Sequence, residues 1–420
     1  MSGQSPVRQG ELVLIDLADA EPSTSGGKAA VLARLLGAGL PVPPGFVVPT
    51  AAYEAAVAGL DLAEPGAARR RIGELPLAPA LVEAISRALA RLRHESVAVR
   101  SSASGEDTAD GTAAGQHDTF LGVSGPEQVA GAVGGCWASL WSERAVGYRR
   151  WLATHGPDRS PTMAVLVQRL VDADVAGVLF TGAEVRIEAS WGLGESVVGG
   201  RVTPDSWTVH GDTVLRRVLG GKANRLDRVR SRVVARAVPL ADQERFCLTD
   251  EQLGRLVALG RDTADLLGGP QDIEWAIADG RIWLLQARPV TAPPPDAPAA
   301  HPGQPRHGRS PAVGTSVLTG TPGSPGIAVG PARVVGGPGD FARVRAGDVL
   351  VCRTTDPAWT PLFGVVAAVV TETGGVLSHA AIVAREQGLP AVLSVPGAMA
   401  ALPDGATVEV DGGTGRVTSA

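Results

Sequence analysis

Apolar positions recur along the chain with two different spacings, which predict a mixture of helices and strands. Apolar residues three and four positions apart predict helices over residues 29–36, 50–59, 78–94, 126–152 and 253–267. Short runs rich in β-branched residues predict strands over residues 97–100, 163–171, 176–180, 187–189 and 205–209. The pattern favours a multidomain fold of the α/β and α+β classes.

One stretch near the C-terminus combines both patterns. Residues 365–370 predict a buried strand, Gly374 and Gly375 interrupt it, and residues 380–386 predict a helix, which places His379 at the turn. Helix N-terminal N–H groups favour an anion beside the imidazole, such as a phosphoryl group. Small residues on both sides leave room for a bulky donor. The alternative is a partly buried turn histidine that is bonded to backbone.

A second candidate lies in the two alternating segments 271–277 and 282–288. A two-residue turn at Asp279 and Gly280 would mix polar and apolar side chains on each face. A three-residue loop would pair Asp272 with Gln286 and Trp275 with Trp283. We therefore expect four polar residues on one face: Asp272, Glu274, Gln286 and Arg288. Such a set suits a magnesium ion on a polyphosphate, and the alternative is an exposed polar sheet face.

Several isolated polar residues are also candidates. Lys28 follows two glycines at a helix start, where backbone and a mobile charge can approach a phosphate, although a solvated lysine is the alternative. Arg100 ends an apolar strand and needs an anionic partner, which a polyphosphate would supply. Gln168 interrupts another strand, and the alternative is a buried amide bonded to backbone. We expect Lys222 to be exposed to solvent.

Composition narrows the class of protein. A net charge of -5, a pI near 5.9 and 4% aromatic residues give no nucleic-acid footprint. No signal pattern or membrane-length apolar run appears, so we expect a cytoplasmic protein. The three cysteines lack metal-ligand spacing and imply no disulfide. Residues 291–313 are proline-rich and predict a linker that could span roughly 60 Å.

The segment Thr373-Gly374-Gly375-Val376-Leu377-Ser378-His379-Ala380-Ala381-Ile382-Val383-Ala384-Arg385-Glu386, with residues 388–392, resembles the phosphohistidine domain of the pyruvate phosphate dikinase and phosphoenolpyruvate synthase family. Rifampin phosphotransferase belongs to the same family. Residues 27–32 with 43–46, 100–107 with 115–121, 191–196 and 272–289 resemble its ATP-binding domain. The resemblance implies an ATP-grasp-like domain over residues 1–290, the linker at 291–313 and a swivelling β/β/α phosphohistidine domain over residues 314–420.

The resemblance also assigns roles to residues. His379 would carry the phosphoryl group, and the metal ligands would be Glu274 and Gln286. The remaining contacts with ATP would come from Lys28, Arg100, Gly115, Thr119, Gln168, Asp272 and Arg288. Ala113 stands where the family commonly has an aromatic residue, so the local wall of the pocket is expected to differ.

The function implied by the resemblance is ATP-driven phosphorylation of His379, with AMP as the nucleotide product and Mg²⁺ as cofactor. The phosphoryl group would then pass to an unidentified acceptor, either a small molecule or a separate acceptor-bearing protein. The dikinases and synthases carry a large barrel for pyruvate, and rifampin phosphotransferase carries a drug-binding domain between the other two, whereas here the linker alone joins the two domains. Two alternatives are a phosphocarrier subunit of a split enzyme and a non-catalytic nucleotide-binding regulator, and neither nucleic acid nor a membrane is an expected partner.

Overall fold

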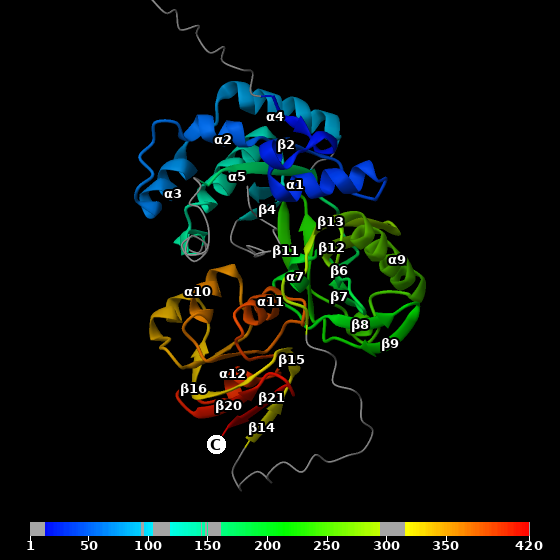
Figure 1. The fold of residues 1–420 in the computed structure, drawn as a ribbon, viewed down its shortest axis with the longest axis vertical. Coiled ribbons are helices and arrows are strands. Elements are labelled where there is room, and N and C mark those ends of the chain that lie inside the picture. The colour runs from blue at the N-terminus through cyan, green and yellow to red at the C-terminus, as the bar shows by residue number, and fades with distance from the viewer. Residues whose placement is uncertain are drawn as a thin grey trace, which may run out of the picture.

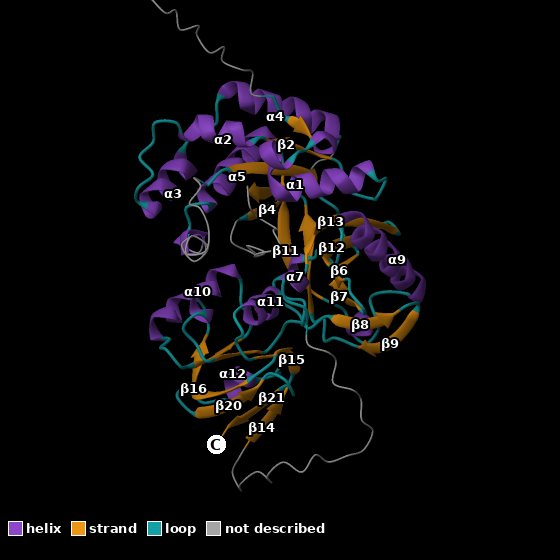
Figure 2. Ribbon diagram, in the orientation of Figure 1, coloured by secondary structure: helices purple, strands orange, loops and turns teal. Residues whose placement is uncertain are grey.

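The computed structural model describes residues 13–93, 96–103, 118–143, 145–147, 149, 161–294 and 316–419. Three bodies, each built on a sheet, follow one another along this part of the chain (Figure 1). In Figure 1 the first body lies at the top, the second lies below it on the right, and the third lies below it on the left. Figure 2 shows that helices and strands occur in all three.

The first body is an antiparallel five-stranded sheet with the order β1-β2-β5-β3-β4. Its strands are β1 (Ile15–Asp16), β2 (Gly45–Val48), β3 (Val97–Ala103), β4 (Thr119–Val123) and β5 (Met163–Arg169). Its helices are η1 (Leu17–Asp19), α1 (Pro22–Gly37), α2 (Thr50–Val57), α3 (Pro65–Glu74), α4 (Pro79–Leu92) and α5 (Pro126–Ser139).

The run of apolar residues in β5 follows from burial on both faces of this sheet. Val165 and Val167 pack in the core beneath α2, α4 and α5, whereas Ala164 and Leu166 pack in the core that contains α1. Side chains alternate faces along a strand, so a strand between two cores needs apolar residues at every position.

The second body is an antiparallel six-stranded sheet with the order β13-β12-β6-β7-β8-β9. Its strands are β6 (Val175–Phe180), β7 (Val185–Trp191), β8 (Asp205–His210), β9 (Thr213–Val218), β12 (Gln271–Ala278) and β13 (Arg281–Pro289). A separate hairpin and three helices accompany it: β10 (Asn224–Val229), β11 (Arg232–Ala237), α7 (Glu195–Val198), α8 (Leu240–Gln243) and α9 (Asp250–Leu267).

The third body is an eight-stranded sheet with the order β14-β21-β20-β16-β17-β18-β19-β15, in which β16 to β19 run parallel. Its strands are β14 (Ser316–Thr319), β15 (Thr321–Ser324), β16 (Ile327–Val335), β17 (Val349–Cys352), β18 (Ala368–Thr371), β19 (Ala391–Leu393), β20 (Thr407–Asp411) and β21 (Arg416–Ser419). Its helices are η2 (Pro338–Arg343), η3 (Pro357–Trp359), α10 (Thr360–Phe363), α11 (His379–Glu386) and α12 (Ala398–Ala401).

The third body packs against the second through a small apolar cluster. Leu377 and Ile382, at the start of α11, contact side chains of β6 and of the segment around α7. The partners in that cluster are Val178, Phe180, Val197 and Val202. Alternation in β6 explains this contact, because Leu179 points to the opposite face and joins the core beneath α9.

Most predicted elements are present, and the differences have local causes. The helix predicted over residues 126–152 ends at Ser139 as α5, and the Ser142 hydroxyl accepts a hydrogen bond from the Ala145 N–H and so caps a new turn. Helix α3 was not predicted because only Ala68 and Ile72 of its residues are buried. Strands β9 to β11 were missed because they are polar and largely exposed.

The expectation that Lys222 is exposed is wrong. Its side chain is 0% exposed, and Nζ lies 2.5 Å from Oδ1 of Asp205, which is equally buried. Nζ also donates to the carbonyl groups of Gly220 and Gln243, at 3.0 and 3.2 Å. Asp205 in turn accepts from the N–H groups of Gly220 and Cys247. The polar residues around position 222 do not reveal this pair, because Asp205 comes from β8.

Two further observations concern the cysteines and the possibility of membrane-spanning helices. The three cysteines Cys136, Cys247 and Cys352 are free, and all three are buried. Among the described residues, no helix is both long enough and apolar enough to cross a membrane.

The buried ion pair generates a prediction about stability. Asp205→Ala should lower the free energy of unfolding by ~3–5 kcal/mol, because it leaves the Lys222 ammonium buried without its counter-charge. Equilibrium urea unfolding measures this change. The matched control is Glu83→Ala, which removes a pair with Arg87 whose side chains are 72% and 63% exposed and should cost less than about 1 kcal/mol. Equal effects of the two substitutions would contradict the prediction.

Candidate functional site

A cavity of about 500 Å³ lies where the three bodies meet. This volume is typical of sites for small-molecule ligands. Nine of the ten site residues predicted from the sequence line it: Lys28, Arg100, Thr119, Gln168, Asp272, Glu274, Gln286, Arg288 and His379. The tenth, Gly115, lies outside the described residues.

Lys28 is held at the cavity by the tight start of α1. Gly26 has φ 73°, and a Cβ atom there would lie 2.1 Å from the Ser102 carbonyl oxygen, so only glycine allows α1 to approach β3 this closely. The Ser102 hydroxyl donates to the Ser25 carbonyl and accepts from the Ala29 N–H. Nζ of Lys28 is buried and donates to the Ser101 carbonyl at 3.0 Å. The expectation of a cation beside a helix start is thus met by a buried lysine.

Arg100 places a second buried cation on the cavity wall. Its Nη1 donates to the Leu285 carbonyl of β13 at 3.0 Å. Nε is buried, and no described residue accepts a hydrogen bond from it. Because buried polar groups are normally paired, an unpaired guanidinium nitrogen at a cavity indicates an anionic ligand.

The β12–β13 hairpin carries the four polar residues on one face, as predicted. Glu274 lies opposite Gln286, and Asp272 lies opposite Arg288. Arg288 donates from Nε and Nη2 to Oδ2 of Asp272, at 2.8 and 2.7 Å. Burial raises the pKa of Asp272, and the Arg288 guanidinium opposes that rise. Asp272 therefore orients Arg288 toward the cavity.

The predicted register of this hairpin is wrong. Ala278 pairs with Arg281, so the turn is the two-residue Asp279-Gly280 turn, and both residues have positive φ. A bulge between Glu274 and Trp275 then shifts the pairing by one residue. That shift brings the polar residues back to one face. A bulge cannot be placed from alternation alone, which is why the three-residue loop seemed necessary.

Thr119 and Gln168 line the cavity from the first sheet. Thr119 begins β4 and lies opposite Arg100. The Gln168 side chain is buried, and its Nε2 donates to the Pro43 carbonyl at 2.9 Å. The amide nitrogen of Gln168 is therefore bonded to backbone, as the alternative interpretation expected. The residue also lines the cavity.

His379 is the first residue of α11 and follows the buried strand β18, as the pattern predicted. The imidazole is buried at the cavity, and Nε2 lies 3.4 Å from the hydroxyl of Thr360, which begins α10. A side-chain hydroxyl thus contacts the ring. The third body contributes this single predicted residue to the site.

The turn before His379 does have an anion beside it, but the anion belongs to the protein. The Glu188 carboxylate of β7 accepts hydrogen bonds from the N–H groups of Val376 and Leu377. Burial raises the pKa of Glu188 to about 7, and these N–H groups and the nearby Arg385 act in the opposite direction. The space beside Gly375 is therefore filled by Glu188, and it does not provide clearance for a donor.

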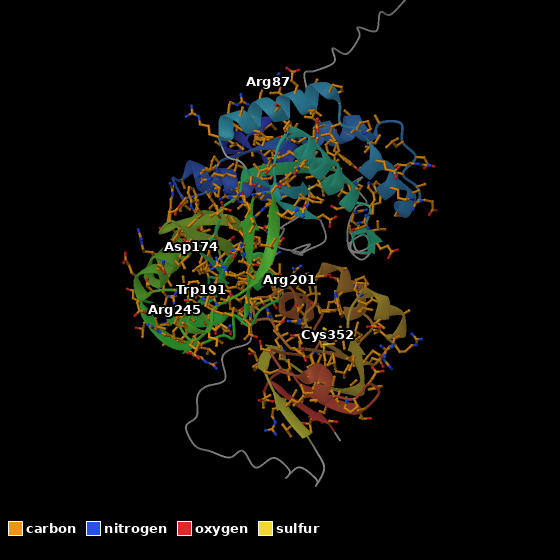
Figure 3. The ribbon with its side chains drawn as sticks, turned by 180° about the vertical axis from the view of Figure 1, so that it is seen from behind. Arg87, Asp174, Trp191, Arg201, Arg245 and Cys352 are labelled. Carbon is orange, nitrogen blue, oxygen red and sulfur yellow. The ribbon has the colours of Figure 1, made fainter. Side chains whose placement is uncertain are left out.

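Sequence reasoning assigned no role to several further residues at the cavity. Glu195 begins α7, where burial raises the pKa of its carboxyl group, Arg201 and Arg100 lower it, and Glu274 raises it. Arg201, labelled in Figure 3, lies near the boundary between the second and third bodies. Thr360, which contacts the His379 ring, was also missed, although it does not line the cavity itself. The glycine-rich segment 191–196 was a signal for Glu195, whereas nothing in the local pattern distinguishes Thr360.

Comparison with known families gives two matches. Residues 23–306 match the family described as pyruvate phosphate dikinase, AMP/ATP-binding domain. Residues 344–415 match the family described as PEP-utilising enzyme, mobile domain. The first match contains the predicted nucleotide contacts and the second contains His379.

Two of the relatives cover nearly the whole chain, and a third covers part of it. A probable phosphoenolpyruvate synthase of Methanothermobacter thermautotrophicus is 35% identical over 94% of this chain and 61% of its own length. The phosphoenolpyruvate synthase of Pyrococcus furiosus is 33% identical over 93% of this chain and 56% of its own length. The prodigiosin synthesizing transferase PigC of Serratia marcescens is 42% identical over 64% of this chain and 32% of its own length. The chain thus spans about three fifths of the two synthases.

Proposed function

The chain belongs to the pyruvate phosphate dikinase and phosphoenolpyruvate synthase family, and from this premise we propose that it is an ATP-dependent, dikinase-type phosphotransferase. It phosphorylates its own His379 from ATP, forms AMP, and relays the phosphoryl group to an acceptor. The observation that carries this proposal is the single cavity lined both by His379 and by the predicted nucleotide contacts. A phosphoryl donor bound there would lie beside the imidazole.

Three of the five cationic side chains that line the cavity are the ones expected to contact a polyphosphate. Lys28, Arg100 and Arg288 come from three different elements, and Arg100 has a buried Nε without a protein acceptor among the described residues. Binding an ATP polyphosphate would compensate this charge. Gln168 and Thr119 line the same cavity, where Gln168 would contact adenine or ribose and Thr119 a phosphate. Gly115 remains a predicted phosphate contact.

Glu274 and Gln286 are the proposed magnesium ligands. They lie opposite each other on β12 and β13 and face the cavity. The Glu195 carboxyl group lies near enough that the charge of Glu274 raises the pKa of Glu195. Mg²⁺ commonly uses one or two protein oxygen ligands together with water and substrate phosphates, which fits this set. When bound, the ion would neutralise charge that develops on the transferring phosphoryl group.

The transfer itself is a displacement at phosphorus. An imidazole nitrogen of His379 forms a bond to phosphorus as the bond from phosphorus to the departing oxygen breaks. AMP is the final nucleotide product, so the second phosphoryl group passes to water or to inorganic phosphate. Delivery to the acceptor breaks the N–P bond and forms a bond from phosphorus to an acceptor oxygen. The Thr360 hydroxyl, 3.4 Å from Nε2, helps to hold the ring.

The relay requires that the domain carrying His379 moves. Phosphoryl transfer needs in-line contact at about 3 Å, so one fixed position cannot serve both donor and acceptor. We therefore propose an ATP-grasp-like domain over residues 1–290, a linker over residues 291–313, and a swivelling β/β/α domain over residues 314–420. The proline-rich composition of the linker suits a semi-rigid spacer.

We propose a small molecule as the acceptor. The names of the relatives include phosphoenolpyruvate synthases and a prodigiosin synthesizing transferase, which are proteins that make small molecules. A separate acceptor-bearing protein is the second candidate, because the chain spans only part of the length of these relatives. A partner protein that co-purifies with the chain and receives the phosphoryl label would favour the second candidate.

The first prediction concerns His379. Incubation with Mg²⁺ and β- or γ-labelled ATP should produce an acid-labile, base-stable phosphoryl adduct, and His379→Ala should abolish it because no other imidazole lines the described cavity. Nucleotide binding, measured by calorimetry, should persist in the variant. The control is His210→Ala, on an exposed histidine of β8. A label that remains on His379→Ala would disprove the assignment.

The second prediction concerns Glu274. Glu274→Ala removes a carboxylate ligand, so the Mg²⁺ concentration for half-maximal adduct formation should rise at least about tenfold, which corresponds to ~1.4 kcal/mol. The fold should remain, as judged by circular dichroism. Glu184→Ala, at the partly exposed turn before β7, is the control and should leave the Mg²⁺ dependence unchanged. An unchanged dependence in Glu274→Ala would remove Glu274 from the metal site.

The third prediction concerns the movement. The hydroxyl oxygens of Thr203 and Ser394 lie 3.0 Å apart on the two sides of the interface. A Thr203→Cys, Ser394→Cys disulfide should allow labelling of His379 by ATP but block transfer of that label to an acceptor, and reduction should restore transfer. Transfer in the locked protein at the unlocked rate would rule out swivelling.

A further inference from the structure

Glu188 reaches from the second body into the loop that precedes His379. Its side chain is 3% exposed. Oε1 accepts a hydrogen bond from the Val376 N–H at 2.7 Å, and Oε2 accepts one from the Leu377 N–H at 3.0 Å. One carboxylate therefore contacts two successive main-chain groups of the third body, two and three residues before His379.

Gly375 makes this contact sterically possible. A Cβ atom at position 375 would lie 2.0 Å from Oε2 of Glu188 and 2.4 Å from its Cδ and Oε1. Gly375 does not have a positive φ, so the backbone conformation alone does not require glycine there. The requirement comes from the approach of the Glu188 side chain.

In the surrounding hydrogen bonds, too, the third body donates and the second body accepts. The Gly374 N–H donates to the Val202 carbonyl at 3.1 Å. The Thr354 hydroxyl lies within hydrogen-bonding distance of the Gly199 and Gly200 carbonyl oxygens, and the Thr373 hydroxyl donates to the Gly200 carbonyl at 2.7 Å. In each of these contacts the third body supplies the donor, and the second body supplies the acceptor.

The apolar contact between these bodies is small and has no direction. It consists of Leu377 and Ile382 against the side chains of β6 and the α7 segment. Apolar contact of this kind does not set the register of two surfaces, whereas hydrogen bonds to a buried charged group do so and are costly to leave unmade.

We propose that Glu188 is the docking residue for the phosphohistidine domain, and that it positions His379 by binding the main chain of residues 375–377. This inference rests on the proposed function only in calling that domain a phosphohistidine carrier. Glu188 touches neither reacting atoms nor nucleotide in this arrangement, so it is a positioning residue. Because the bound N–H groups lie so near His379 in the chain, a shift of the loop on Glu188 would shift the imidazole in the cavity.

The experiment measures docking without requiring any chemistry at His379. The full chain with Thr203→Cys and Ser394→Cys forms a disulfide only when the bodies are docked, and the native cysteines Cys136, Cys247 and Cys352 are all buried. The initial rate of crosslinking under a mild oxidant reports the docked population. Only the oxidant is added to the protein, and no nucleotide is present.

Gly375→Ala in this background should slow crosslinking by about tenfold or more, which corresponds to a loss of at least ~1.4 kcal/mol in docking. The matched control is Gly364→Ala in the same domain, where the nearest atom to an added Cβ lies 3.9 Å away. The control should crosslink at the parent rate. A parent rate in Gly375→Ala would overturn the proposal.

A double variant separates docking by Glu188 from general disruption. Glu188→Ala alone should also slow crosslinking, because the Val376 and Leu377 N–H groups lose their acceptor. Once the carboxylate is absent, the methyl group of Gly375→Ala no longer meets it, so the double variant should crosslink no more slowly than Glu188→Ala. If the double variant slowed crosslinking by the product of the two single effects, the two residues would act independently. That result would overturn the proposal.

Labelling of His379 by ATP then gives a separate readout. The three variants should retain nucleotide binding and lose adduct formation in proportion to their loss of crosslinking. If the parent chain forms no adduct at all, the proposed function fails while the crosslinking rates still decide the docking role of Glu188. If the variants crosslink slowly, as expected, but still form the adduct as fast as the parent chain, the positioning role is overturned.

Discussion

The structure depends on the requirement that buried charge be compensated inside the protein. Lys28, Arg100 and Arg288 line one cavity, and all three are buried. Arg288 is paired with Asp272, whereas Arg100 keeps a buried nitrogen that no described residue accepts. One hydrogen-bond donor at the cavity is therefore left unpaired among the described residues, and an anionic ligand would pair with it.

The same sheet supplies both the core and the site because side chains alternate along its strands. In β12, Ile273 and Trp275 pack in the core with α9, while Asp272 and Glu274 face the cavity. The core face thereby fixes the position of the functional face, since a shift by one residue would expose the apolar set. Packing behind the polar residues holds Glu274 and Gln286 opposite each other.

Features encoded within a few residues could be predicted from the sequence, and features that depend on distant residues could not. The strand, glycines and helix around His379, and the shared face of Asp272 and Glu274, follow from local periodicity. The bulge after Glu274 does not, because alternation alone favours a three-residue loop without a bulge. The burial of Lys222 depends on Asp205, and the contact of His379 with Thr360 depends on how α10 packs. Long-range packing decides each of these.

The direction of the hydrogen bonds between the second and third bodies determines which carrier domains could be exchanged for one another. The second body accepts hydrogen bonds from main-chain N–H groups and threonine hydroxyls of the third body. A carrier domain from another protein would fit this surface if it kept the backbone of the loop and the glycine facing Glu188. The apolar contacts of Leu377 and Ile382 add a second condition, so that a change of carrier would have to keep these side chains as well as the loop.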